Sequence, residues 1–197
     1  NPKMTQDEVN SYLQYYFMVK RPAENAEASK AWLEKIEKKS GVQKTESGLL
    51  YKVTKAGDER LKAVDSRDVV KVHYTGRTRD GKVFDTSLFK NRSKEQQEML
   101  KQQNPEGYDQ DEPIEFPLNR VIAGWTEGMK LVGKGGKITL WIPAELAYGA
   151  RGAGRDIGPN EALEFEVELI DVTPYQAPEP ENAEEAAIDA FDATEKK

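Results

Sequence analysis

The amino-acid sequence predicts an α+β protein, in which an antiparallel sheet wraps around a short helix and an all-helical N-terminal arm precedes the sheet. Two patterns carry this prediction. Apolar residues recur at helical spacing within residues 1–41, and they alternate at strand spacing in several runs between residues 45 and 172. One short helical stretch, residues 123–131, lies among the strand runs. We therefore expect a helical arm at 1–41, a sheet domain at 42–173 and a tail at 174–197.

The arm is expected to contain two helices. Thr5 and Glu8 form a capping-box pair, which marks the start of the first. Pro22 interrupts the helical pattern and is expected to open a second helix, which stops at Gly41. Two such helices do not close a core alone, so their apolar stripe needs a partner surface, either its own barrel or another subunit. The stripes consist of Val9, Tyr12, Leu13, Tyr16 and Phe17, and of Ala28, Trp32, Leu33 and Ile36.

The sheet domain is predicted from four runs in which apolar and polar residues alternate, as in a strand with one buried face. Turn signals such as Asp80-Gly81 and Gly158-Pro159 separate them. The apolar positions of the runs are Leu49, Tyr51 and Val53; Val70, Val72 and Tyr74; Ile138, Leu140 and Ile142; and Leu163, Phe165, Val167 and Leu169.

Two segments do not follow the strand rhythm. Residues 88–112 are polar, and the capping-box pair Ser93 and Gln96 predicts a short surface helix inside a long inserted loop. Residues 174–197 are acidic and rich in alanine, and we expect a solvated tail. A docked terminal helix at residues 186–191 is the alternative.

Composition excludes several classes of function. The 197 residues include no cysteine and one histidine, which excludes zinc–thiolate sites and cysteine nucleophiles and leaves little for a catalytic triad. The net charge of −6 argues against a nucleic-acid partner. We therefore expect no metal, no cofactor and no nucleic acid. No apolar run approaches the ~20 residues that cross a bilayer. The chain starts at Asn1 and not at a methionine, as expected where a targeting segment has been removed.

Several motifs, taken in order, resemble the FKBP family of peptidyl-prolyl cis-trans isomerases. VHYTG at 72–76 and DGKVFD at 80–85 resemble the opening of an FKBP domain, and VIAGW at 121–125 with EGM at 127–129 resembles its helix-entry motif. IP at 142–143, LAYG at 146–149 and the alternating residues 163–169 resemble the last two strands and the loop between them. TESGLLYKV at 45–53, preceded by helices, is similar to exported bacterial FKBPs related to macrophage infectivity potentiator, whose helical arms form a dimer.

The resemblance implies a pocket that holds a prolyl residue. Trp125 would be its floor and the other rings its walls. The Tyr148 hydroxyl and the Ile122 N–H would donate hydrogen bonds to substrate, and Asp85 would accept one from Tyr74 or orient the peptide. The matched catalytic positions are Tyr74, Phe84, Asp85, Trp125, Tyr148 and Phe165, and the matched substrate-binding positions are Ile114, Val121, Ile122 and Ile157.

Isomerisation places few chemical demands on such a pocket. The twisted amide lies ~18–20 kcal/mol above the planar one because twisting breaks its resonance. Water stabilises the planar, charge-separated amide, so a dry apolar site favours the twisted form without a nucleophile. Taken singly, most of these side chains are ones that any small barrel would bury, and Asp85 is an ordinary turn residue. Their joint occurrence in family order favours the functional interpretation.

Four positions depart from the family pattern. Ile114 stands where many members have phenylalanine, Ala153 where a larger residue is common, Asp156 where an aliphatic is usual and Gly158 where proline is usual. The loop between the last two strands is therefore expected to be more polar and more mobile. Macrolide binding, which the resemblance also implies, is thus less strongly expected than catalysis.

Three classes of function remain open. The first is an isomerase that acts on proline-containing unfolded or secreted polypeptides. The second is a chaperone or holdase whose helical dimer binds clients. The third is a module that docks a proline-containing partner with little turnover. The resemblance and the start at Asn1 favour a homodimer in a bacterial cell envelope, periplasmic or membrane-anchored after signal removal.

Overall fold

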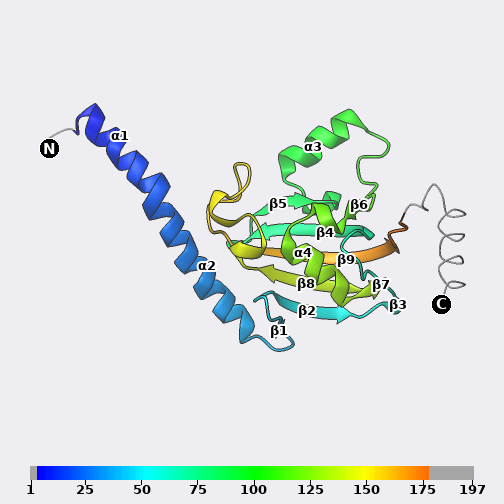
Figure 1. Cartoon of the computed structure of the whole chain (residues 1–197). Coiled ribbons are helices and arrows are strands. Elements are labelled where there is room, and N and C mark those ends of the chain that lie inside the picture. Colours follow the sequence, from blue (N-terminus) through cyan, green and yellow to red (C-terminus); the bar gives the residue numbers. More distant parts are fainter. Residues whose placement is uncertain (1–3, 178–197) are drawn as a thin grey trace, which may run out of the picture.

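The computed structural model describes residues 4–177 of the chain. Figure 1 shows a long N-terminal helix beside a curved sheet, with a short helix against one face of that sheet. This α+β arrangement confirms the predicted fold class. The alternative of a docked terminal helix at residues 186–191 lies outside the described residues. In the described part of the chain, no helix is both long and apolar enough to span a bilayer.

Pro22 lies in the first turn of a second helix, as predicted, but the predicted interruption of the arm at this residue is wrong. Helices α1 (Gln6–Tyr15) and α2 (Arg21–Glu37) are joined without interruption by a π-helical turn at Tyr16–Lys20. A proline lacks the N–H of a helical hydrogen bond and crowds the carbonyl four residues earlier. Here the Arg21 N–H donates to the Tyr16 C=O, five residues earlier instead of four. This π-helical turn is wider than an α-helical turn, and Pro22 follows it in the first turn of α2.

The two halves of this helix have different surroundings. No residue of α1 or of the π-helical turn is buried. In α2, Ile36 packs with Leu50 and Trp141, and Trp32 and Leu33 are partly buried against the same cluster. The helix therefore uses its C-terminal half to dock on the sheet, and its N-terminal half remains exposed.

The main sheet contains seven strands in the order β1-β2-β8-β9-β4-β5, with β6 also paired to β4, and every pairing is antiparallel. Strands β3 and β7 form a separate two-stranded sheet. The strands are β1 (Gln43–Lys44), β2 (Leu50–Lys55), β3 (Asp58–Lys62), β4 (Val69–Thr78), β5 (Val83–Thr86), β6 (Ile114–Pro117), β7 (Gly133–Lys134), β8 (Lys137–Ile142) and β9 (Leu163–Thr173).

Helix α4 (Ala123–Gly128) lies against the sheet because two glycines allow close approach. A Cβ on Gly124 would come within 2.5 Å of Ile142, and one on Gly128 within 2.6 Å of Leu140. The alternating positions predicted from the sequence mostly join this core, but Val53 is 36% exposed. The short 3₁₀ turns are Phe89–Asn91, Leu118–Arg120, Met129–Leu131, Ala144–Leu146 and Gly149–Arg151.

The inserted segment forms the predicted surface helix, α3 (Lys94–Gln103). The Ser93 side chain accepts the Gln96 N–H, and the Gln96 side chain accepts the Ser93 N–H, which confirms the second capping box. Phe89 and Tyr108, at the two ends of the insertion, pack edge to face with ring centroids 5.1 Å apart. The insertion is thus a folded element at the β5–β6 side of the sheet (Figure 1).

Candidate active site

A hollow of about 340 Å³ lies between α4, the β4–β5 hairpin and β9. Eight of the ten residues predicted to form the site line it, so strands and loops far apart in the sequence converge here. The lining residues are Tyr74, Phe84, Asp85, Phe116, Arg120, Val121, Ile122, Trp125, Tyr148 and Phe165.

The floor of the hollow is an aromatic cluster centred on Trp125, which is 4% exposed. Its indole meets the rings of Tyr74, Phe116 and Phe165 edge to face, with centroids 5.3, 5.5 and 5.4 Å away. Phe84 meets Phe165 in the same way at 5.6 Å. Edge-to-face contacts are the favoured geometry of aromatic pairs, so the rings hold one another in place.

The indole N–H of Trp125 is buried and has no hydrogen-bond partner among the described residues. A buried polar hydrogen is normally paired, so this donor is an exception, in a floor where Tyr74, Phe116 and Phe165 pack on the indole. The floor offers an apolar face and no charge to a bound group.

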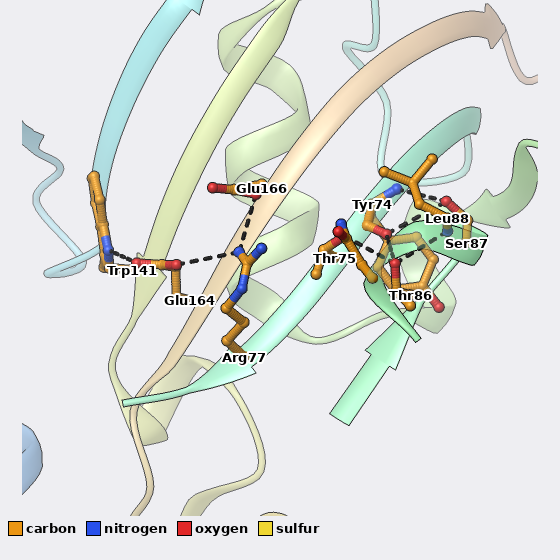
Figure 2. Close-up of polar contacts among 10 residues, drawn as sticks. Tyr74, Thr75, Arg77, Thr86, Ser87, Leu88, Trp141, Glu164 and Glu166 are labelled. Atoms are coloured by element: carbon orange, nitrogen blue, oxygen red, sulfur yellow. Dashed lines mark hydrogen bonds and ion pairs between the residues drawn. The ribbon is translucent and has the colours of Figure 1, made fainter. Parts of the chain in front are cut away.

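The backbone of Tyr74 is fixed from the β5 side, as Figure 2 shows. Its N–H donates to Ser87 Oγ at 2.9 Å, and its C=O accepts from the Ser87 N–H and from Thr86 Oγ1, each at 3.0 Å. The Tyr74 hydroxyl donates to Asp85 Oδ2 at 2.5 Å. These bonds set the position of the phenol and of the carboxylate at the wall of the hollow.

Both phenols of the site stay protonated to higher pH than an ordinary tyrosine. Burial, followed by the hydrogen bond to Asp85, raises the pKa of Tyr74. Burial, followed by the negative charge of Asp85, raises the pKa of Tyr148. Tyr148 lines the hollow and is 40% exposed, so this side chain lies at its mouth and carries a neutral hydroxyl.

Ile122 is the N-cap residue of α4, and its C=O accepts from the N–H groups of Trp125 and Thr126. Its own N–H belongs to the helix N-terminus, where backbone donors have no acceptor within the helix. With Tyr148, Ile122 thus gives the site a neutral side-chain donor and a backbone donor beside an apolar floor. No group of three or more metal-ligating side chains occurs within residues 4–177.

The sheet also carries a polar network that Figure 2 shows (Trp141, Glu164, Arg77 and Glu166). Trp141 Nε1 donates to Glu164 at 2.7 Å, and Arg77 pairs with Glu164 and Glu166 at 3.5 and 3.0 Å. These contacts join β8, β9 and β4, and so fix the register of the strands that carry Tyr74 and Phe165.

Comparison with known proteins agrees with this geometry. A family model described as FKBP-type peptidyl-prolyl cis-trans isomerase matches residues 61–170. A second, described as the domain amino terminal to FKBP-type peptidyl-prolyl isomerase, matches residues 1–53. The chain belongs to the FKBP-type peptidyl-prolyl cis-trans isomerase family.

Bacterial FKBP-type proteins with similar sequences confirm the narrower resemblance. A probable FKBP-type isomerase of Haemophilus influenzae is 45% identical over 133 residues, which is 68% of this chain and 46% of that protein. FkpA of Escherichia coli is 41% identical over 179 residues, 91% of this chain and 57% of FkpA. Mip of Coxiella burnetii is 38% identical over 148 residues, 75% of this chain and 55% of Mip.

A solved structure is also similar. The crystal structure of FkpA from Escherichia coli matches with a TM-score of 0.65 at 38% identity, covering 88% of this chain and 76% of that one. The chain spans about half the length of the curated relatives that it matches.

Two predicted FKBP site residues do not line the hollow. Ile157 is buried in the core cluster. Ile114 is 38% exposed and lines a separate hollow beside α3. Sequence reasoning missed Phe116 and Arg120, which do line the site. Phe116 follows Ile114 by two residues on β6, so strand alternation alone puts both on one face and could have identified it.

The loop between β8 and β9 contains three of the four departures from the FKBP pattern, Ala153, Asp156 and Gly158. Asp156 forms an ion pair with Lys82 of the β4–β5 hairpin. Ala153 and Ile157 form an isolated β-bridge within the loop. The loop is as polar as predicted, but these contacts argue against the mobility that the sequence led us to expect.

Proposed function

We propose that this protein accelerates cis–trans rotation of X-Pro peptide bonds, with the hollow over Trp125 as its active site. The observation that carries the proposal is the aromatic floor with a neutral phenol, Tyr148, at its mouth. A prolyl ring is an apolar group whose size fits such a floor, and the family of the chain is defined by this activity.

The proposed mechanism depends on desolvation and orientation. A prolyl amide held over Trp125 loses the water that stabilises its planar form, which lowers the relative free energy of the twisted state. The Tyr148 hydroxyl and the Ile122 N–H orient the flanking carbonyl groups of the peptide. Asp85 holds the Tyr74 phenol and keeps that wall fixed. No covalent intermediate and no proton transfer are required.

A protease-coupled assay of a short X-Pro peptide tests this proposal. Uncatalysed exchange takes tens to hundreds of seconds, so acceleration is measurable directly. Tyr148→Phe removes one neutral hydrogen bond worth ~0.5–1.5 kcal/mol, so kcat/KM is expected to fall about two- to twelvefold. Asp85→Leu is expected to cost more, because the Tyr74 hydroxyl loses its acceptor.

Two results would contradict the proposed isomerase mechanism. A folded wild-type protein that leaves the uncatalysed rate unchanged would refute the isomerase proposal and favour a module that only docks proline-containing partners. A loss of more than ~10³-fold in Tyr148→Phe, with folding intact, would indicate acid–base or covalent chemistry instead of desolvation.

We also propose that the exposed half of the arm forms a homodimer. Tyr12, Tyr15, Phe17, Met18 and Val19 are each more than half exposed. Exposed apolar patches of this kind mark interaction surfaces. In a symmetric dimer, the same apolar surface of a second arm would cover it. Light scattering at micromolar concentration is expected to give twice the mass of the chain. A monomer under these conditions would contradict the proposal.

The same surface favours a second function, the binding of unfolded clients as a chaperone. Aggregation of a denatured model protein separates the two activities. Tyr148→Phe reduces turnover without touching the arm, so it is expected to suppress aggregation as well as the wild type does. Loss of suppression in this variant would mean that the pocket, and not the arm, holds the client.

The clients we propose are proline-containing unfolded or secreted polypeptides, and the location is a bacterial cell envelope, by likeness to FkpA and Mip. Macrolide binding stays a prediction; titration with a macrolide, followed by tryptophan fluorescence, tests it.

A further inference from the structure

The helical arm contacts the loop that carries Tyr148. This loop connects β8 to β9, and Figure 1 shows its yellow trace beside the middle of the long helix. The contact is distinct from the apolar docking of Ile36 near the end of α2, because it is made by polar side chains to the backbone of the loop.

Ser29 is the centre of this contact. Its side chain is buried, at 5% exposure for the residue. Its Oγ donates to Asn160 C=O at 2.9 Å and accepts the Ala162 N–H at 3.0 Å. One hydroxyl thus satisfies a backbone acceptor and a backbone donor at the end of the loop. Ala162 is itself fully buried, and Ser29 Oγ is the acceptor that satisfies its N–H.

Two amides extend the contact along the helix. Asn25 Nδ2 donates to Pro159 C=O at 2.9 Å, and Asn160 Nδ2 donates to Pro22 C=O at 3.1 Å. The helix and the loop are close enough that a Cβ on Gly158 would lie 2.8 Å from Asn25 Nδ2. Each bond joins residues more than 130 positions apart in the sequence.

Asn160 connects the arm to the turn at Tyr148. It is the only non-glycine residue of the described chain with a positive φ, 54°. A non-glycine residue in this region carries a conformational cost, which surrounding contacts must offset. Its N–H donates to Gly149 C=O at 2.8 Å, immediately after Tyr148. A continuous path of hydrogen bonds therefore runs from Pro22 and Ser29 of the arm, through Asn160, to the turn that presents the Tyr148 hydroxyl.

We propose that Ser29 and Asn25 are positioning residues for the active site: they hold the loop of residues 149–162 so that Tyr148 stays at the mouth of the hollow. This inference rests on the proposed isomerase function. In this proposal the arm helps to position the site, although every matched pocket residue lies in the sheet domain.

The mechanism predicts a particular kinetic pattern. If loss of the contact lets the loop leave the binding-competent position, the apparent affinity for substrate falls with the fraction of competent molecules. Bound substrate restores the competent position, so kcat changes little. For Ser29→Ala we expect KM to rise about two- to tenfold and kcat to change by less than about twofold. Asn25→Ala removes one bond and is expected to have a smaller effect in the same direction.

The experiment combines steady-state kinetics on a short X-Pro peptide with amide hydrogen exchange of the full chain. Ser29→Ala and Asn25→Ala are expected to speed exchange in residues 149–162 at least about threefold, and to leave β4 and α4 unchanged. Ser29→Thr keeps the hydroxyl and is expected to retain most of the wild-type KM. Glu27→Ala is the matched control, because Glu27 lies on the exposed side of the same helix.

Each outcome decides a separate question. Unchanged exchange in the loop for both alanine variants would refute the contact as a clamp. Faster exchange with an unchanged KM would refute its role in positioning Tyr148. If Ser29→Ala does not fold, Asn25→Ala, at a half-buried helical position, gives the same readouts. A wild-type chain without isomerase activity would overturn the proposed function, while hydrogen exchange would still test the clamp.

Discussion

Aromatic rings gather in two regions of this molecule, and their surroundings differ. In the site, Trp125 and Phe165 are each 4% exposed, and their centroids lie 5.4 Å apart. In the arm, Tyr16 and Phe17 lie 5.2 Å apart in a similar edge-to-face contact, yet Phe17 is 52% exposed. Ring contact by itself therefore does not make a core.

The origin of the rings explains the difference. The buried cluster draws its members from β4, β5, β6, α4 and β9, so the whole fold must form before the rings meet. Tyr12, Tyr16 and Phe17 belong to one continuous helix and meet through local spacing alone. The first arrangement leaves Trp125 and Phe165 almost no contact with water, and the second leaves most of the rings exposed.

The largest effect on stability is expected for a substitution of Trp125, at the centre of the buried cluster. Trp125→Ala removes the ring on which three others pack, and replacement of a buried tryptophan by alanine costs ~3–5 kcal/mol. Urea unfolding followed by circular dichroism measures this loss. A decrease below about 1 kcal/mol would mean that the cluster collapses around the gap and that the floor is not rigid.

Two carboxylates, one buried and one exposed, extend the comparison, and the effect expected on stability is of intermediate size. Asp68 is 2% exposed and accepts the N–H groups of Val64, Asp65 and Tyr175. Asp68→Asn loses part of this set, so unfolding at neutral pH is expected to become easier by ~1–3 kcal/mol. The control is Glu24→Gln in the arm, whose exposed pair with Lys20 spans 3.8 Å, and which is expected to cost less than ~0.5 kcal/mol.

The Asp68 effect has a defined pH dependence. Burial opposes ionisation, but the three backbone N–H bonds outweigh it and hold the pKa of Asp68 below its ordinary value. A carboxyl with a lowered folded pKa stabilises the protein above its unfolded pKa, and this contribution disappears as the pH falls through the folded value. The difference between wild type and Asp68→Asn is therefore expected to narrow below about pH 4. A constant difference down to pH 2 would contradict the assignment.

For the exposed ring of Phe17 in the arm, we predict a small contribution to the free energy of unfolding and a large one to dimer formation. Phe17→Ala is expected to change the free energy of unfolding by less than ~0.5 kcal/mol, because the ring is half exposed. If the arm forms the dimer interface, the same change raises the dissociation constant at least about tenfold, measured by sedimentation equilibrium. Gln14→Ala, an exposed polar position of α1, is the control. Equal dissociation constants in both variants would remove the arm aromatics from the interface.

The smallest expected effect is that of pH on turnover. Burial, with Asp85 as the further cause, raises the pKa of both Tyr74 and Tyr148, so both hydroxyls remain protonated between about pH 6 and pH 9. We expect kcat/KM to vary by less than about twofold across that range. A bell-shaped profile would show that a titrating group takes part in the reaction.

Local features of the fold were predictable because their causes lie within a few residues. Each capping box joins residues three apart, at Thr5 and at Ser93. Strand periodicity located the buried faces of β4, β8 and β9, and helix α4 lies where the pattern changes. Motif order identified eight residues of the hollow, since those side chains lie at fixed offsets from recognisable turns.

The sequence by itself therefore determined the main helices and the long strands, the family and most of the pocket. Only the tertiary structure decided that Leu50 and Trp141 receive the arm, that Phe116 and not Ile114 completes the hollow, and that Ser29 bonds to the backbone of Asn160 and Ala162. The physical reason is distance along the chain. These contacts join residues tens to more than a hundred positions apart, and no local pattern records which distant backbone group a side chain will meet.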